Sequence, residues 1–502
     1  MASFLSDNND NKINIAVREL IQNSIDAIHV YRMLTMQDNL AVGKIKVCIE
    51  KEENNYFLVV SDNGIGMSQN LLTNELLDFG GSYWKTNKFY NDFKGLPSKG
   101  FESIGKYGIG FFSSFMLGKE ITVTSWKYGE SIDAMRTLDF YDGLLSNPTL
   151  RLPTEKEKNS IIDRGTTVRI KLKNNPYDDE GIIYDENFYD CTLKSLVQYY
   201  IPSVDVEINV IELDGSSSSI LPNSIEKLNF LEIMEYIDIK DIDAIYKKIG
   251  FVKRTSRPSW IDFLKKYPMQ LIEIIENGKI LGKLSILPRK ESIAFDFGRN
   301  EFAIILAKGI RVKSIEDFAG YISTNEVVSI KRDQAAKIIS YESMKAWASE
   351  QLKQIEKLNL NEEYKDIIND LIITFNFFDE NFVLAKYKKD NQYTDATISD
   401  FKEYAKLNDK LVLYNECELE KNRLDTCDGF INVAHGLNMR EIIIDSDLEK
   451  ANHTQKIIKT ILQEEWQEFE QSVEHNMKFD LASTEPYKTI WTFTRKIKSK
   501  QE

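Results

Sequence analysis

Three polar residues at helical spacing raise the first chemical question in this sequence. Glu19, Asn23 and Asp26 lie three or four positions apart in RELIQNSIDA (residues 18–27), beside apolar residues that repeat with a helical period. This spacing places the three side chains on one face of a helix. Two carboxylates and a carboxamide on one face could form the floor of a site that moves protons or holds a cation, or the solvated edge of a surface helix.

Glycine-containing motifs downstream are compatible with ligand-binding turns. Residues 62–67 (DNGIGM) follow an apolar strand pattern, so a carboxylate stands at a strand end and two glycines let the backbone approach a flat ligand. Residues 105–112 (GKYGIGFF) place three glycines before a predicted helix, whose free N–H groups suit phosphate. Gly-Thr-Thr at 165–167 begins a later strand pattern. Each motif alone fits ordinary turn, loop or strand chemistry better, and neither a P-loop nor a Rossmann fingerprint is present.

The periodicity around these motifs predicts an α/β unit. A helical pattern spans 13–35, alternating patterns predict paired strands at 44–50 and 56–61, and a later strand is predicted at 164–172. Residues 80–107 are Gly- and Lys-rich and aperiodic. A connection of this length inside a compact domain is usually a functional lid or a disordered segment.

The composition fits a soluble globular protein. The chain has 502 residues, 42% hydrophobic content and a formal net charge of −14, so we expect about three domains and no broad DNA-coating surface. This charge argues against nucleic acid as a partner, although a local basic groove is compatible with it. No apolar run reaches the ~18 residues that a membrane-spanning helix needs, and the first residues lack the apolar segment of a signal peptide. With four scattered cysteines, we expect a cytoplasmic protein with no membrane partner.

Composition also divides the chain into three predicted domains. The segment DGSSSSILPNS at 214–224 is typical of a linker, so we predict domains at 1–213, 225–340 and 341–502. The third domain is predicted to be mostly helical, with an amphipathic helix at 454–473.

The order of the motifs resembles the GHKL superfamily of ATPases, which includes gyrase, histidine kinases, MutL and the ninety-kilodalton heat-shock chaperones. Glu-x-x-x-Asn-x-x-Asp-Ala, Asp-x-Gly-x-Gly, a lid, Gly-x-x-Gly-x-Gly and Gly-Thr occur in the family's order. The continuation GIGFFSSFM is similar to the chaperone branch. The resemblance implies an α/β (α+β) fold with a Bergerat-type ATP-binding sandwich, in which helices cover one face of a mixed sheet, in residues 1–213. It also implies a middle domain with a catalytic loop at 225–340, followed by a diverged interaction or dimerisation domain at 341–502.

The same resemblance implies roles for individual residues. Asn23 would place its amide oxygen on the Mg²⁺ that bridges the phosphates of ATP, and Glu19 would orient or deprotonate the attacking water. Asp62 would accept the adenine amino group, with Thr166 completing that network and Met67 packing on the ring. Asp26 would stand in the pocket wall or just behind it. The remaining implied contacts to the nucleotide come from Gly64, Gly66, Gly105, Lys106, Tyr107, Gly108, Ile109, Gly110 and Phe111.

A middle-domain arginine of the chaperones reaches the γ-phosphate. Arg332 in SIKRDQ stands at the matching position, with Lys331 as a near rival. The resemblance therefore implies Arg332 as a second catalytic residue, and residues 80–107 as the lid that controls the reaction.

The leading functional hypothesis is a chaperone-like ATPase. It would bind ATP–Mg²⁺, close its lid and hydrolyse ATP to drive a clamp on a protein client or partner subunit, with a homodimer as one candidate assembly. The alternative is a regulatory ATPase subunit of a multi-protein system, such as bacterial antiviral defence or DNA repair. A non-hydrolysing ATP sensor ranks lowest, because Glu19 is present.

Overall fold

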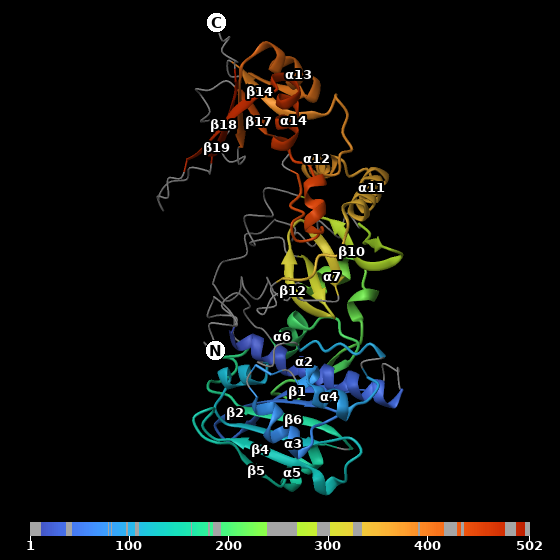
Figure 1. Cartoon of the computed structure of the whole chain (residues 1–502), viewed down its shortest axis with the longest axis vertical. Helices are drawn as coiled ribbons and strands as arrows, with labels where there is room; N and C mark the ends of the chain where they lie inside the picture. Colours follow the sequence, from blue (N-terminus) through green and yellow to red (C-terminus); the bar gives the residue numbers. More distant parts are fainter. Residues whose placement is uncertain are drawn as a thin grey trace. The chain divides into compact units, whose positions relative to one another are not determined.

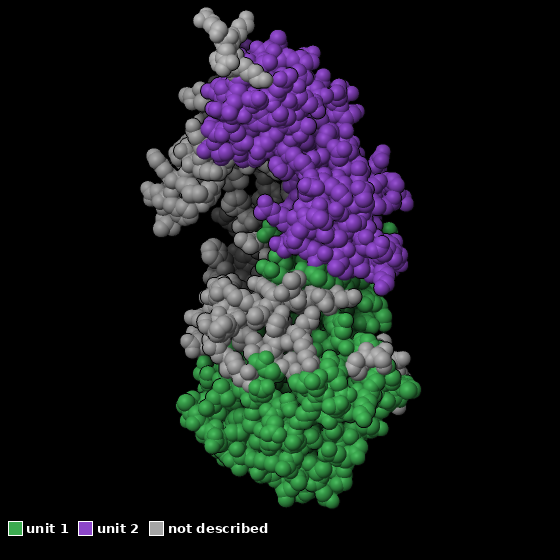
Figure 2. Space-filling model, in the orientation of Figure 1, with its two compact units in different colours: residues 1–271, 301–336 green, residues 272–300, 337–502 purple. Residues whose placement is uncertain are grey.

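A computed structural model shows how the chain is arranged in two compact units (Figures 1 and 2). One unit holds residues 1–271 and 301–336, and the other holds residues 272–300 and 337–502. The structure describes residues 12–36, 43–78, 80–81, 83–96, 99–105, 110–161, 163–178, 181–183, 192–237, 269–288, 302–324, 334–389, 392–415, 429–432, 436–476 and 488–496.

The first unit contains a mixed eight-stranded sheet in the order β5-β4-β3-β6-β2-β1-β7-β8. Neighbouring strands are antiparallel except β1 and β7, which are parallel. The strands are β1 Lys44–Glu52, β2 Asn55–Asp62, β3 Ile121–Trp126, β4 Arg136–Phe140, β5 Thr149–Arg151, β6 Gly165–Lys171, β7 Glu207–Ile211 and β8 Ser217–Ile220.

One long helix covers this sheet. Helix α2 (Lys12–Thr35) buries Ile21, Ile25 and Ile28 completely, in the same core cluster as the inward residues of β1 and β2. Burial along β1 alternates from Lys44 to Val47, as the period of two in a strand requires, and the next residues, Cys48 and Ile49, are both buried. The expected ATP-binding sandwich architecture, with helices against a mixed sheet, is therefore confirmed. The shorter elements of this part are α3 Gln69–Thr73, η2 Glu75–Leu77, η3 Tyr83–Lys85, α4 Asn87–Asp92, η5 Phe111–Met116, η6 Ile132–Ala134, α5 Glu155–Ser160 and α6 Leu193–Tyr200.

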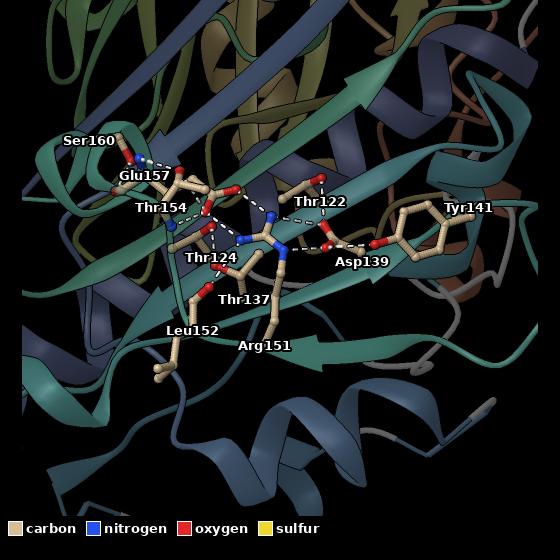
Figure 3. A network of polar contacts seen from close by, with 10 residues as sticks. All are labelled: Thr122, Thr124, Thr137, Asp139, Tyr141, Arg151, Leu152, Thr154, Glu157 and Ser160. Carbon is tan, nitrogen blue, oxygen red and sulfur yellow. Dashed lines mark hydrogen bonds and ion pairs between the residues drawn. The ribbon is translucent and has the colours of Figure 1, made fainter.

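A polar network fastens the outer strands of the sheet (Figure 3). Arg151 of β5 pairs with Asp139 of β4 and donates to both carboxylate oxygens of Glu157 in α5, each at 2.7 Å. Asp139 is 5% exposed and also accepts from Thr122 of β3 at 2.9 Å. Because β5 has three residues and little buried surface, this network supplies much of its attachment.

The prediction that residues 214–224 form a linker is wrong, because part of this Ser-rich segment belongs to the sheet. Residues 217–220 form β8, which pairs with β7 in the register Ile208↔Ile220 to Ile211↔Ser217. A serine-rich edge strand gives a linker-like composition, because only Ile220 of β8 is buried and the serines bond to polar side chains of β7 at the exposed edge.

A second group of strands in the same unit follows α7 (Phe230–Ile237) and η7 (Ser224–Lys227). Strand β11 (Phe302–Ala307) pairs antiparallel with β12 (Ile310–Ile315) and parallel with β13 (Phe318–Thr324).

The other unit begins with the hairpin of β9 (Ile272–Glu276) and β10 (Lys279–Ile286), on which α11 (Tyr341–Lys357) packs. The buried indole of Trp347 donates to the carbonyl of Leu284 at 3.0 Å. The rest of the unit contains α12 Lys365–Thr374, β14 Val383–Lys389, β15 Gln392–Thr397, α13 Ile398–Leu407, β16 Lys410–Asn415, β17 Gly429–Asn432, η8 Asp445–Lys450, α14 Thr454–Trp466, β18 Phe469–Asn476 and β19 Lys488–Arg495.

The expectation of a mostly helical region at 341–502 needs correction. Among the described residues of this region, six strands form one sheet in the order β15-β14-β17-β16-β19-β18, and α13 and α14 share a core cluster with it. The predicted helix 454–473 ends at Trp466, because Gln467 adopts a φ of +63° and the chain then enters β18. In the described part of the chain, no helix is long and apolar enough to cross a membrane.

Candidate functional site

A cavity in the first unit brings the separate sequence motifs together. It lies between α2, the ends of β2 and β6, and the segment that precedes η5. The sequence-predicted residues that line it are Glu19, Asn23, Asp62, Gly66, Met67, Gly105, Gly110, Phe111 and Thr166. Asp26 and Gly64 are not part of the lining but lie directly behind it.

The α2 side of the cavity carries the first motif. Glu19 is 5% exposed, and its Oε1 lies 3.4 Å from the guanidinium Nη2 of the equally buried Arg18. A Cβ built on Gly110 would lie 2.7 Å from Glu19 Oε2 and 3.7 Å from Asn23 Nδ2. The absence of a side chain at Gly110 therefore leaves the carboxylate and the carboxamide together at one end of the cavity.

Asp26 binds the backbone of the segment that leads to Gly105 in the cavity lining. Its carboxylate is fully buried and accepts hydrogen bonds from the backbone N–H of Ile104 at 2.7 Å and of Gly105 at 2.8 Å. Burial raises the pKa of Asp26 to about 6, although these two hydrogen bonds and the nearby charges of His29 and Lys308 act in the lowering direction. The resemblance implies Asp26 in the pocket wall or behind it; the carboxylate lies behind the lining, where it binds the backbone of Ile104 and Gly105.

Asp62, the last residue of β2, lines the same cavity. Its Oδ1 accepts from the N–H of Gly64 at 2.9 Å, and its Oδ2 accepts from the hydroxyl of Ser24 at 3.1 Å. Burial is the main cause that raises the pKa of Asp62 to about 7. Sequence reasoning missed Ser24, because this residue occupies a position within the apolar stripe of α2; a hydroxyl at such a position is the signal that could have found it.

A second hydroxyl network adjoins Asp62. Thr166 Oγ1 and Ser125 Oγ lie 2.8 Å apart, and Ser125 Oγ accepts from the N–H of Met67 at 2.8 Å. Ser125 joins β3 to β6 and to the DNGIGM turn, so it orients two cavity-lining residues at once. Nothing in the alternating pattern of ITVTSW distinguishes Ser125 from other strand serines, and the sequence analysis does not identify it.

The glycines of DNGIGM have structural reasons of their own. A Cβ on Gly64 would lie 2.7 Å from the backbone and Cβ of Ala27 in α2. Gly66 has a φ of +68°, and its Cβ would lie 2.0 Å from the carbonyl oxygen of Trp126. The two glycines therefore let the end of β2 fit between α2 and β3, in addition to leaving room for a ligand.

The described part of residues 80–107 forms an aromatic cluster. Tyr83, Trp84 and Phe93 line the cavity, and they pack with Phe89 and Phe101 against the C-terminal half of α2. Their irregular spacing explains why the sequence appears aperiodic, since the cluster includes a 3₁₀ turn, the short helix α4 and irregular backbone. Lys106, Tyr107, Gly108, Ile109, Lys331 and Arg332, which the sequence analysis assigns to the site, lie outside the described residues.

The cavity end at Asn23 suits a nucleotide-bound Mg²⁺. Among the described residues, no group of three or more His, Cys, Asp or Glu side chains forms a metal cage. Mg²⁺ in nucleotide sites takes one or two protein ligands and completes its shell with waters and phosphate oxygens. The carboxamide of Asn23 lines the cavity together with Gly105 and Gly110, whose lack of side chains leaves its atoms uncrowded, and this fits that mode of binding.

Comparisons with known proteins agree with this geometry. Residues 11–164 match the family described as histidine kinase-, DNA gyrase B-, and HSP90-like ATPase. The chaperone protein HtpG of Halalkalibacterium halodurans is 29% identical over 297 residues, which are 57% of this chain and 44% of the relative.

Two further relatives match over shorter stretches. HtpG of Anaplasma marginale is 30% identical over 210 residues (41% of this chain, 30% of the relative), and HtpG of Natranaerobius thermophilus is 34% identical over 195 residues (37% and 28%). The chain thus spans less than half the length of these relatives. The expected resemblance is confirmed: residues 11–164 carry an ATPase domain of the histidine kinase-, DNA gyrase B- and HSP90-like type, in a chain that is similar to HtpG chaperones.

Proposed function

We propose that this chain binds ATP with Mg²⁺ in the cavity beneath α2, hydrolyses it, and uses the cycle as a chaperone-like clamp on a protein client or partner subunit. The observation that carries the proposal is the convergence of Glu19, Asn23 and Asp62 on one cavity, although they come from two motifs on different elements. The matches to an ATPase family and to HtpG chaperones support the same reading.

Asp62 would select the base. Its carboxylate accepts from Ser24 and from the N–H of Gly64, and its position in the cavity lining leaves it able to accept from a ligand as well. An acceptor favours the amino group of adenine over the carbonyl that guanine presents at the same position. Thr166 would complete this contact, oriented by Ser125.

Glu19 and Asn23 would act on the phosphates. Asn23 would hold Mg²⁺, which neutralises phosphate charge and orients the terminal group when it is bound. Glu19, one helical turn earlier, would accept a hydrogen bond or proton from the attacking water, and its contact with Arg18 fixes the carboxylate orientation. Most of the catalysis in such a site is positioning, so the burial of Glu19 beside Gly110 matters as much as its basicity.

The clamp function is supported by the chaperone relatives. We propose a protein client or partner and, as one assembly, a dimer of this chain; closure of residues 80–107 over the nucleotide would drive the clamp. The alternative, a regulatory ATPase subunit of a defence or repair system, is favoured by the limited coverage of the relatives, of which 44% or less is matched.

Calorimetry and turnover test the nucleotide proposal. Titration with ADP–Mg²⁺ should give a binding heat in the unaltered protein, and Glu19→Gln should keep that heat while losing at least a hundredfold in turnover. The matched control is Glu207→Gln, a strand carboxylate that pairs with Lys44 away from the cavity, and it should keep both. Absence of any heat with ADP or ATP, or full turnover in Glu19→Gln, would refute the proposal.

Client protection separates the two biological roles. Suppression of aggregation of a heat-unfolded test protein, dependent on ATP and lost in Glu19→Gln, supports the chaperone. Lack of suppression in an active ATPase, together with effector genes beside its own gene, supports the regulatory subunit.

A further inference from the structure

A tight turn in the second strand group lies against the ATPase domain. Lys308 and Gly309 connect β11 to β12 with φ angles of +50° and +82°, a two-residue hairpin turn. The carbonyl of Gly309 accepts from the N–H of Ser203 at 3.2 Å, and a Cβ on Gly309 would lie 1.9 Å from the Ser203 carbonyl oxygen. Only glycine fits against Ser203 at this position, so the turn is held at a fixed place beside the segment that follows α6.

Lys308 extends from this turn to the segment that lines the cavity. Its Nζ donates to the backbone carbonyl of Glu102 at 3.0 Å and lies 3.4 Å from the Glu102 carboxylate. The side chain of Lys308 is 23% exposed, whereas that of Glu102 is 68% exposed, so water screens the ion pair with the Glu102 carboxylate and the shorter bond to the carbonyl is the contact that matters here. Two and three residues after Glu102 come Ile104 and Gly105, whose N–H groups donate to the carboxylate of Asp26.

A separate set of contacts connects the segment that contains Ser203, against which the turn packs, to α2. Asp205, two residues after Ser203, accepts from Arg32 at 2.9 Å and pairs with His29 at 2.7 Å. Helix α2 is therefore linked to the β11–β12 turn twice, once through Asp205 and once through the Glu102–Gly105 segment. A shift of the turn has to break or strain one of these links.

We propose that Lys308 is a positioning residue for the phosphate end of the cavity: by holding the Glu102 carbonyl it fixes the backbone up to Gly105 and couples that backbone to the β11–β13 strands. The inference deepens the proposed function and rests on it where turnover is concerned. The positioning itself is a property of the protein without nucleotide, so it has a separate readout.

The test compares Lys308→Met, which keeps the chain length but removes the donor, with Lys308→Arg, which restores one. The matched control is Lys119→Met, which removes an exposed lysine paired with Asp142 at 2.9 Å elsewhere in the same domain. Hydrogen exchange without nucleotide should show the Ile104 and Gly105 amides exchanging about tenfold faster in Lys308→Met, with the amides of the β1–β2 pair unchanged.

Turnover gives the second readout. Lys308→Met should lower kcat about tenfold with KM changed less than threefold, because the adenine end of the cavity is untouched, and Lys308→Arg should recover most of the loss. Wild-type exchange at Ile104 and Gly105 in Lys308→Met would overturn the proposal. If the protein turns over no ATP, the proposed function fails, while the exchange experiment still decides the role of Lys308.

Discussion

Replacement of Asp62 by Asn should stabilise the protein above neutral pH while it abolishes nucleotide binding. Burial raises the pKa of Asp62 from 3.8 to about 7, so the folded protein holds this proton more tightly than the unfolded chain does. Between these two pH values the native state binds more protons, and its free energy of unfolding therefore falls as the pH rises. The loss of stability caused by ionising Asp62 is absent below pH 3.8 and fully present above about pH 7.

The magnitude follows from the size of the shift. A displacement from 3.8 to about 7 corresponds to roughly 4 kcal/mol at pH 8, taken as an upper bound because the protein relaxes around a buried charge. Asn cannot ionise, yet its amide oxygen can still accept from the N–H of Gly64, and its NH₂ group, in the place of Oδ2, can donate to the hydroxyl of Ser24. The variant should thus be more stable than the unaltered protein at pH 8 by about 1–4 kcal/mol, and nearly equal at pH 4.

Urea unfolding at pH 4, 6 and 8 measures this difference, with tryptophan fluorescence reporting on the ATPase domain through Trp84 and Trp126. Calorimetry with ADP–Mg²⁺ on the same samples should show that Asp62→Asn loses binding, because a carboxamide that accepts from Gly64 turns its NH₂ group toward the amino group of adenine. Asp142→Asn, an exposed carboxylate, is the control that should change neither quantity. A variant that is less stable than the unaltered protein at pH 8, or one that binds ADP normally, would refute the reasoning.

Two further substitutions test the geometry of the cavity and of the sheet edge. Gly110→Ala should reduce turnover at least tenfold, because the new methyl group would lie 2.7 Å from Glu19 Oε2 and would displace that carboxylate. Steady-state kinetics measure the turnover. An unchanged kcat would show that the carboxylate can move without loss of activity. Arg151→Met should lower the free energy of unfolding by about 1–3 kcal/mol, because Asp139 and Glu157 lose their shared cation while Asp139 stays buried. Urea unfolding at pH 7 measures this free energy. An unchanged unfolding midpoint would mean that the network does not stabilise the attachment of β5.

The sequence predicts the parts of the fold whose patterns are local. The helical pattern at 13–35 corresponds to α2 at Lys12–Thr35, and the alternating segments at 44–50 and 56–61 correspond to β1 and β2. The residues of these elements that enter the core cluster recur with the helical or the strand period, so the sequence displays that period. Their motifs also meet at one cavity, which is what the order of the motifs implies.

The features that the sequence does not reveal depend on distant partners. Strand β8 has a serine-rich, mostly exposed sequence, and only its pairing with β7 makes it a strand. The sequence of residues 467–473 still fits the helical pattern of α14, although the helix ends before Gln467. The pairing of β18 with β19, rather than a local signal, therefore decides where the helix gives way to a strand. Ser125 gains its importance from contacts with two other segments, which no single window of sequence contains.

The place of β6 in the sheet sets a minimum for what can fold alone. The family match ends at residue 164, yet β6 begins at Gly165 and lies between β3 and β2, in the interior of the eight strands. The edge beyond β1 is closed only by β7 and β8, which come after α6. A fragment cut where the recognisable signature stops would lack a central strand and Thr166 with it, so an autonomous nucleotide-binding piece has to continue at least to Ile220.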